Sequence, residues 1–206
     1  FADSTELTLE IHDAQGNLVR KLSSKGNPDF QSYAGGPSPD PTLSTRKGIN
    51  RFVWDLRYPT VPGIPTAYIE SSFRGHKAIP GTYSLKLSAG NVVAEAKGEI
   101  QDVPGSKISA ADFQAYHQWM SALEGEVTQM HNLVNTAKKY QDQLQDLIGR
   151  LDTKVEYKDL KLSAQNLVKE LTAWDESMIQ RKSTAYDDVE NFPNKFTANF
   201  QYMMNH

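Results

Sequence analysis

The chain contains 206 residues, enough for one large domain or two small ones with a buried core. Its 22 basic and 25 acidic residues give a net charge of −3, which argues against a nucleic-acid-binding protein, because such proteins rely on a basic surface. The absence of cysteine excludes disulfides, thiolate catalysis and cysteine-bound metals. No apolar run approaches the roughly 18 residues that cross a bilayer. The chain begins with Phe1 rather than Met, so we expect a processed or excised piece of a longer protein.

The first half of the chain, residues 1–104, has the short alternating segments that are typical of β-strands. Leu7–His12 alternates apolar and polar residues, and the turn signal at Asp13–Gly16 predicts that Leu18–Leu22 returns antiparallel. Short strands between turn signals favour an Ig-like antiparallel β-sandwich. Three further strands are predicted at Ile49–Leu56, Thr82–Leu87 and Val92–Ile100. The inward positions of these strands are predicted to be Phe52, Trp54, Leu56, Tyr83, Leu85 and Leu87.

Two long Gly/Pro-rich loops, residues 24–47 and 58–80, interrupt the predicted strands. Loops of this length are uncommon in compact domains and tend to be functional or disordered. Six residues in or beside the loops are candidate contacts for a docked domain or a sugar: Phe30, Tyr33, Arg57, Tyr58, Tyr68 and Phe73. In the alternative, the loops fold back and cap the sandwich, and Arg57 forms an ion pair with Asp55 that fixes the strand edge.

The hydrophobic period changes at Val103–Gly105, and residues 105–206 are predicted to form a helical domain. Apolar residues recur at steps of three and four over residues 109–151, with one interruption at Gln141, which predicts a long first helix with an extended packing seam. A second helix is predicted over residues 157–181, antiparallel to the first because the connection is short. A third is predicted over residues 192–204, with Pro193 in its first turn.

The packing stripe of the second helix is predicted to be Leu160, Ala164, Leu167, Leu171, Trp174 and Met178, and that of the third Phe192, Phe196, Phe200 and Met203. The predicted fold class is therefore α+β with two segregated domains. The Ig-like β-sandwich comes first, and an antiparallel helical hairpin or three-helix bundle with a long first helix follows.

No catalytic constellation is visible in the sequence. Glu124 and Glu126 face different sides of a helix and form no acid/base pair. No nucleophile elbow, phosphate-binding loop or dinucleotide fingerprint occurs. Five scattered histidines form no metal-binding spacing and are interpreted as solvated or singly hydrogen-bonded: His12, His76, His117, His131 and His206. We expect no catalytic residue, no cofactor and no metal in this segment.

Three β motifs carry a resemblance to a known family: Leu7–Arg20, Gly48–Arg57 and Pro80–Leu87. With the helices and the closing segment Asp187–Lys195, the chain resembles the C-terminal region of exported bacterial BNR/sortilin (Vps10)-like β-propeller proteins, often labelled putative glycosyl hydrolases. In those proteins an Ig-like domain follows the propeller and a helical segment closes the chain.

The resemblance implies a non-catalytic accessory or interaction module that is exported and packs on the upstream propeller of the same parent chain. A second protein at the helical tip and a carbohydrate are further candidate partners, whereas nucleic acid and a transmembrane segment are not expected. The alternative function is a carbohydrate-binding module of a glycoside hydrolase. A third hypothesis is self-association through the helical hairpin. Glycoside hydrolase activity of the parent stays open, because its site would lie on the propeller.

Overall fold

The structure is a computed structural model that describes residues 5–205. These residues pack into two compact units that interleave along the chain. Unit 1 contains the described residues up to Ser32, Pro37–Val61 and Arg74–Glu124, and unit 2 contains Tyr33–Gly36, Pro62–Phe73 and the described residues from Gly125 onward. The predicted boundary at residues 104 and 105 marks a change of secondary structure. It does not coincide with the division of the units, which falls inside a helix.

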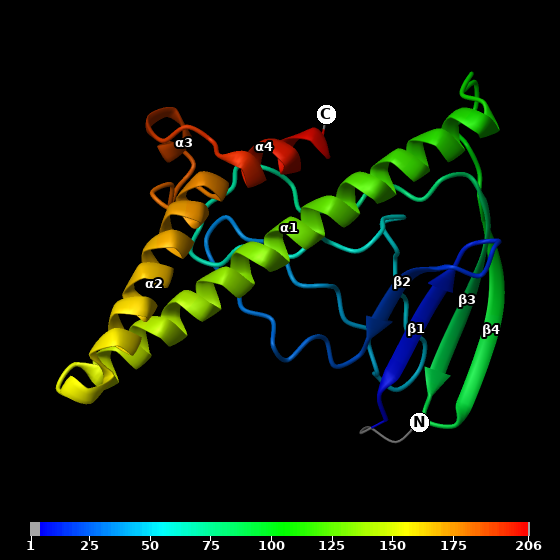
Figure 1. Cartoon of the computed structure of the whole chain (residues 1–206). Coiled ribbons are helices and arrows are strands. Elements are labelled where there is room, and N and C mark those ends of the chain that lie inside the picture. Colours follow the sequence, from blue (N-terminus) through cyan, green and yellow to red (C-terminus); the bar gives the residue numbers. More distant parts are fainter. Residues whose placement is uncertain (1–4, 206) are drawn as a thin grey trace. The chain divides into compact units, whose positions relative to one another are not determined.

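Unit 1 contains a four-stranded antiparallel sheet in the order β2-β1-β3-β4 (Figure 1). Its strands are β1 (Leu7–His12), β2 (Leu18–Ser23), β3 (Gly81–Ala89) and β4 (Val92–Ile100). The first two and the last two form hairpins, and β1 also pairs with β3, with Leu9 opposite Leu87. The sheet confirms these four predicted strands, and with the helices that follow it confirms a mixed α+β chain.

One face of the sheet carries the apolar residues of β1, because alternate residues of a strand point to the same side. Leu7 lies in a cluster with Leu22, Leu43 and Ala89, against which Phe52 packs. Ile11 lies in a second cluster with Val19, Ala78 and Tyr83, against which Trp54 and Tyr58 pack. The loop residues thus complete the core that the sheet begins.

The predicted strand over Ile49–Leu56 is wrong, because this segment pairs with no neighbouring strand. The isolated bridge between Arg57 and Lys77 lies just after this segment, and the left-handed conformation of Leu56 (φ 58°) ends its extended course. Phe52 and Trp54 still face the core, as the alternation predicted, but Leu56 is exposed, and so is Leu87 on β3. The alternation therefore reflected one-sided packing of an extended loop.

Arg20 links both long loops to the sheet. Its guanidinium is buried, pairs with the carboxylate of Asp40 from the first loop, and donates a 2.8 Å hydrogen bond to the carbonyl of Tyr58 from the second. Since Asp40 is half exposed, the pair keeps part of its hydration, and the desolvation cost falls mainly on Arg20. This contact supports the interpretation in which the loops fold back onto the protein.

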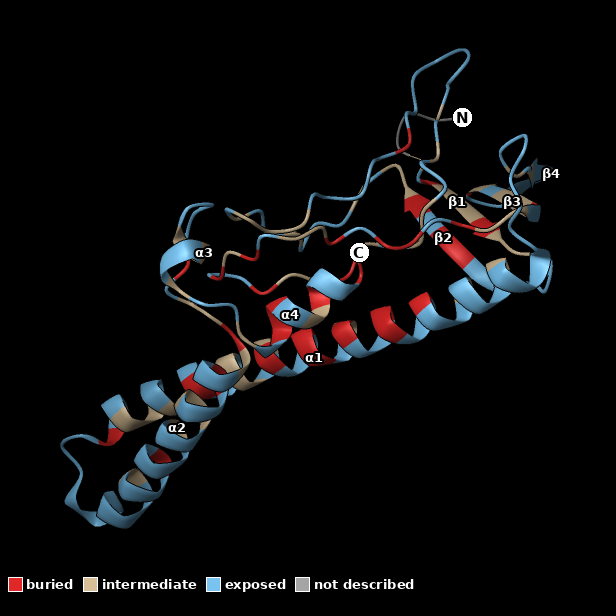
Figure 2. Cartoon of the chain, turned by 90° about the horizontal axis from the view of Figure 1, so that it is seen from above, coloured by how far each residue is buried: buried red, intermediate tan, exposed pale blue. Residues whose placement is uncertain are grey.

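Helix α1 (Ala110–Leu151) is the long first helix that the heptad spacing predicted. Before its first turn, Ser109 and Asp112 exchange side-chain and backbone hydrogen bonds, which satisfies the free amides of the helix start. Buried residues form a stripe along one side of α1 (Figure 2). Val127 and Val134 are fully buried on it, and Gln141, which interrupts the apolar pattern, is buried as well.

Beyond α1, unit 2 contains η1 (Val155–Tyr157), α2 (Lys158–Met178), α3 (Asp188–Asn191) and α4 (Phe196–Met203). The predicted stripe of α2 is partly wrong: Leu160, Leu167 and Trp174 are exposed, while Ala164 and Asp175 are buried. Polar contacts explain why a different face of α2 is buried. Gln141 of α1 donates to the Thr172 hydroxyl at 2.6 Å, and Asp175 accepts two hydrogen bonds from Arg181.

The predicted third helix, residues 192–204, is wrong in its first turn. Phe192 has extended backbone angles (φ −122°, ψ 98°), as a residue before proline prefers, so it ends α3 and Pro193 lies between two helices. Phe196 begins α4 but is exposed. The buried side of α4 is formed instead by Thr197, Ala198 and Gln201.

Candidate functional site

The six residues that the sequence proposed as contacts are divided between the two units. Phe30, Arg57 and Tyr58 belong to unit 1, and Tyr33, Tyr68 and Phe73 belong to unit 2. Phe73 is buried with 6% of its surface exposed, and the other five are half-buried. No one unit therefore brings all six side chains together.

In unit 2, the rings of Tyr33 and Tyr68 both lie against glycines of the first long loop. A Cβ at Gly35 would lie 2.3 Å from the Tyr68 ring, and one at Gly36 would lie 2.6 Å from the Tyr33 ring. Phe73 instead contacts the buried His131, edge to face, at a centroid distance of 6.4 Å. These aromatics are used largely for internal packing.

In unit 1, the predicted ion pair between Asp55 and Arg57 does not form. Asp55 accepts the backbone N–H of Arg57 in a tight turn, and the Arg57 guanidinium donates a 2.7 Å hydrogen bond to the carbonyl of Gly75. Arg57 thereby holds the chain next to His76, the first member of a cluster that the sequence did not reveal.

Glu124 of α1 binds His76 through both of its carboxylate oxygens. Oε1 accepts the backbone N–H of His76 at 2.5 Å, and Oε2 lies 2.9 Å from its Nδ1. Both residues are buried, with 2% of His76 and 9% of Glu124 exposed. The carboxylate thus fixes both the loop backbone and the ring of His76.

The cluster continues from His76 to His117, which lies two turns before Glu124 on the same face of α1. His76 Nε2 lies 2.9 Å from His117 Nδ1. A carboxylate only accepts, so Nδ1–H of His76 donates to Glu124, and with this single ring proton His76 accepts at Nε2 from Nδ1–H of His117. His117 Nε2 is then left as an unprotonated acceptor.

Two tyrosines enclose this chain of three residues. The Tyr58 ring stacks on His76 at 4.2 Å and 9°, and Tyr116 meets His76 edge to face at 5.9 Å. Burial, and then the neighbouring His76, lower the pKa of His117 below its ordinary value. Burial raises the pKa of Tyr58 to about 12, which keeps its hydroxyl a neutral donor. At neutral pH the cluster therefore offers a free imidazole acceptor beside a phenol.

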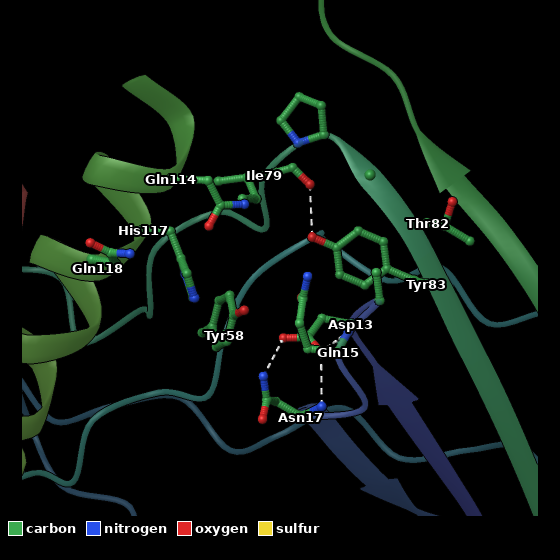
Figure 3. Close-up of a pocket in the computed structure, with 13 residues that line it drawn as sticks. Asp13, Gln15, Asn17, Tyr58, Ile79, Thr82, Tyr83, Gln114, His117 and Gln118 are labelled. Carbon is green, nitrogen blue, oxygen red and sulfur yellow. Dashed lines mark hydrogen bonds between the residues drawn. The ribbon is translucent and has the colours of Figure 1, made fainter. Parts of the chain in front are cut away.

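His117 and Tyr58 also line a pocket of about 460 Å³ in unit 1, within the size range of small-molecule sites (Figure 3). Gln114, His117 and Gln118 reach it from α1, and Thr82 and Tyr83 come from β3. The turn between β1 and β2 supplies Asp13, Gln15 and Asn17. In that turn Asp13 accepts the backbone N–H groups of Gln15 and Asn17, and Gly16 takes a positive φ of 86°.

The sequence contained one usable signal for this cluster. His117 and Glu124 are seven residues apart, so a long helix places them on the same face. His76 has no such signal, since it lies in a loop whose course depends on tertiary contacts. Among residues 5–205, no group of three or more His, Asp or Glu side chains is arranged to hold a metal ion.

Comparisons with protein-family models, with curated proteins and with solved structures gave no match. Within the described part of the chain, none of the helices combines the length and the apolar character that a membrane crossing requires.

Proposed function

We propose that this chain is a non-catalytic accessory and interaction module of a larger exported β-propeller protein. The observation that carries the proposal is the ordered set of three β motifs and a helical segment, which resembles the C-terminal regions of BNR/sortilin (Vps10)-like proteins. An antiparallel sheet followed by helices is consistent with that order. Export is part of the proposal, and it rests on the same resemblance.

The proposal includes a finer fold assignment, an Ig-like sandwich followed by an antiparallel helical hairpin or three-helix bundle. The sheet would form one layer of the sandwich. The segment that includes Phe52 and Trp54, which pack on the apolar face of the sheet, would take the place of the second layer. The hydrogen bond between Gln141 and Thr172 supports pairing of α1 with α2.

A partner surface at the helical end of unit 2 is supported by exposed apolar side chains. Eight large ones are exposed on the unit 2 part of α1, on α2 and on the residues between: Leu133, Tyr140, Val155, Tyr157, Leu160, Leu162, Leu167 and Trp174. Surfaces of this kind, when contiguous, mark interaction sites. A second copy of this chain is the simplest alternative partner, and sedimentation across a concentration series separates the two cases: a dimer supports self-association, and a monomer at every concentration excludes it.

The first experiment is an immunoblot of fractionated source cells with an antibody against this chain. A band in an exported fraction with a much higher mass than that of a 206-residue chain supports the accessory role. A band of the size of this chain in the cytoplasm contradicts both the longer parent and the export.

The second experiment measures binding of the isolated propeller domain to variants of this chain. Phe30→Ser and Tyr33→Ser alter half-buried candidate contacts, one in each unit, and we expect association to weaken by about tenfold if they seat the propeller. Tyr186→Ser changes an exposed tyrosine outside the candidate set and serves as the control. Unchanged association in both test variants, with the fold retained, excludes these contacts.

A further inference from the structure

The pocket of unit 1 lacks the groups that bind charged ligands. None of its thirteen lining residues is Lys or Arg, so a phosphate or carboxylate would find no cationic partner there. Its one carboxylate, Asp13, already accepts three hydrogen bonds, two from backbone amides and one from the Asn17 side chain. Asp13 is therefore occupied in holding the turn, and a cation would gain little from it.

The remaining polar groups of the pocket are neutral, and most of them can both donate and accept hydrogen bonds. The carboxamides of Gln114 and Gln118 each donate and accept. A ligand hydroxyl also donates and accepts, which makes it the matching chemical group. Tyr58 and Tyr83 add ring surface to the same lining, suited to the apolar C–H faces of a ring that carries hydroxyls on its edge.

His117 gives the pocket a directional acceptor. Its Nδ1 is engaged by His76, and the proton assignment that follows from Glu124 leaves Nε2 with a free lone pair. No described residue engages Nε2, so a ligand hydroxyl that enters the pocket can donate to it. The buried His76 holds the ring in place and reduces the entropy lost when the ligand binds.

We infer that this pocket is a binding site for a neutral, hydroxyl-rich ligand, namely a sugar residue. The side-chain amides of Gln114 and Gln118 hold the sugar, and one of its hydroxyls donates a hydrogen bond to His117 Nε2. The site is distinct from the loop aromatics, and of the six sequence candidates only Tyr58 lines it. The inference does not depend on the accessory role, because the pocket lies wholly within unit 1. The sugar has two sources, a free saccharide or the terminal residue of a glycan chain.

The test uses the whole 206-residue chain and a panel of saccharides. D-Glucose, D-galactose, D-mannose and N-acetyl-D-glucosamine are the neutral members, and D-glucuronate and D-glucosamine are the anionic and cationic comparisons. Binding is measured by calorimetry, and the ¹⁵N resonances of the His117 ring are recorded with and without each saccharide. A glycan array provides the second arm, in which the same sugars are presented at chain ends.

We expect at least one neutral sugar to bind with a dissociation constant of about 1 mM or lower and to shift the resonance of His117 Nε2. The double variant Gln114→Ala/Gln118→Ala alters two exposed side chains with a good helix former, so it should fold and weaken binding by about tenfold or more. Gln143→Ala, on an exposed position of α1 outside the pocket, should leave binding unchanged.

Four outcomes overturn the inference. If no neutral sugar binds in either arm, the pocket does not serve this chemistry. If D-glucuronate or D-glucosamine is preferred, the chemical class is wrong. If a neutral sugar binds without moving His117 Nε2, or binds the double variant equally well, then the site lies elsewhere. Binding on the array without binding of free sugars retains the site and assigns it to glycan ends.

Discussion

Glu124 accepts two hydrogen bonds from one residue, His76, through the backbone N–H at 2.5 Å and the ring Nδ1 at 2.9 Å. A carboxylate only accepts, so this pairing determines which nitrogen of His76 carries the proton. The tautomer of His76 in turn determines that of His117, whose Nδ1 lies 2.9 Å from His76 Nε2. One carboxylate in α1 therefore sets the hydrogen-bonding character of a ring that lines the pocket.

Glu124→Gln should reverse both tautomers. The glutamine oxygen still accepts the His76 amide, but its NH₂ group donates to Nδ1, so His76 donates from Nε2 and His117 accepts at Nδ1. His117 Nε2 then carries a proton. We expect the ¹⁵N shifts of both rings to exchange their protonated and unprotonated values and stability to fall by about 1–2 kcal/mol.

Glu126→Gln is the matched control, because Glu126 is two residues away on the same helix and exposed. It should change neither the ring resonances nor the midpoint of urea unfolding. Unchanged tautomers in Glu124→Gln, with a folded protein, contradict the proton assignment.

Stability should decrease as the pH falls below about 6.5, in part because of His131. This side chain is fully buried, donates Nδ1–H to the carbonyl of Pro62 at 2.7 Å, and has no partner at Nε2. Burial lowers the pKa of His131, so below pH 6.5 this side chain is protonated in the unfolded chain but stays neutral in the folded one. The free energy of unfolding therefore falls.

His131→Gln removes this titration and should flatten the dependence of urea midpoint on pH between about 5 and 7. Asn135→Ala is a control without a titrating group, since Asn135 binds the carbonyl of Gly63, the next residue of the same loop. It should lower stability by a similar amount at every pH. An equal pH slope in the wild type and His131→Gln would show that His131 does not carry the effect.

Arg20→Met should destabilise the protein by about 2 kcal/mol, because it removes the buried contacts to Asp40 and to the Tyr58 carbonyl while keeping most of the side-chain volume. Lys21→Met, at an exposed position of the same strand, should change stability by no more than about 0.5 kcal/mol. Urea unfolding of both variants gives the comparison. Equal effects would mean that Arg20 does not anchor the loops.

Substitutions at two glycines distinguish the cost of backbone strain from the cost of a steric clash. Gly16 and Gly35 both have positive φ (86° and 72°), but a Cβ at Gly16 meets nothing within 4 Å, whereas one at Gly35 lies 2.3 Å from the Tyr68 ring. Gly16→Ala should therefore cost about 1 kcal/mol, the strain alone. Gly35→Ala should cost clearly more and shift the Tyr68 ring resonances, and equal unfolding free energies would show that the ring moves aside without penalty.

The sequence was most informative where local pattern and packing agree. Alternation located β1, β3 and β4, and the heptad spacing located α1 to within one residue at its start. It was misleading at Phe52 and Trp54, because one-sided burial produces the same alternation in an extended loop as in a strand.

On α2 the error has a different cause. The buried Asp175 is stabilised by Arg181, which lies beyond the helix, so a stripe of apolar residues could not identify the packed face. The candidate site was missed for a related reason. Its donors and acceptors come from a loop, a turn and a helix, and only the spacing of His117 and Glu124 was visible in the sequence.

The interleaving of the two units constrains the order in which the chain can fold during synthesis. Residues 33–36 and 62–73 leave the ribosome early, yet they belong with residues from Gly125 onward. Unit 1 likewise requires Arg74–Glu124, which includes the first part of α1. A nascent chain cut at residue 104 would complete neither unit, so we expect that the β half and the helical half do not fold independently of each other.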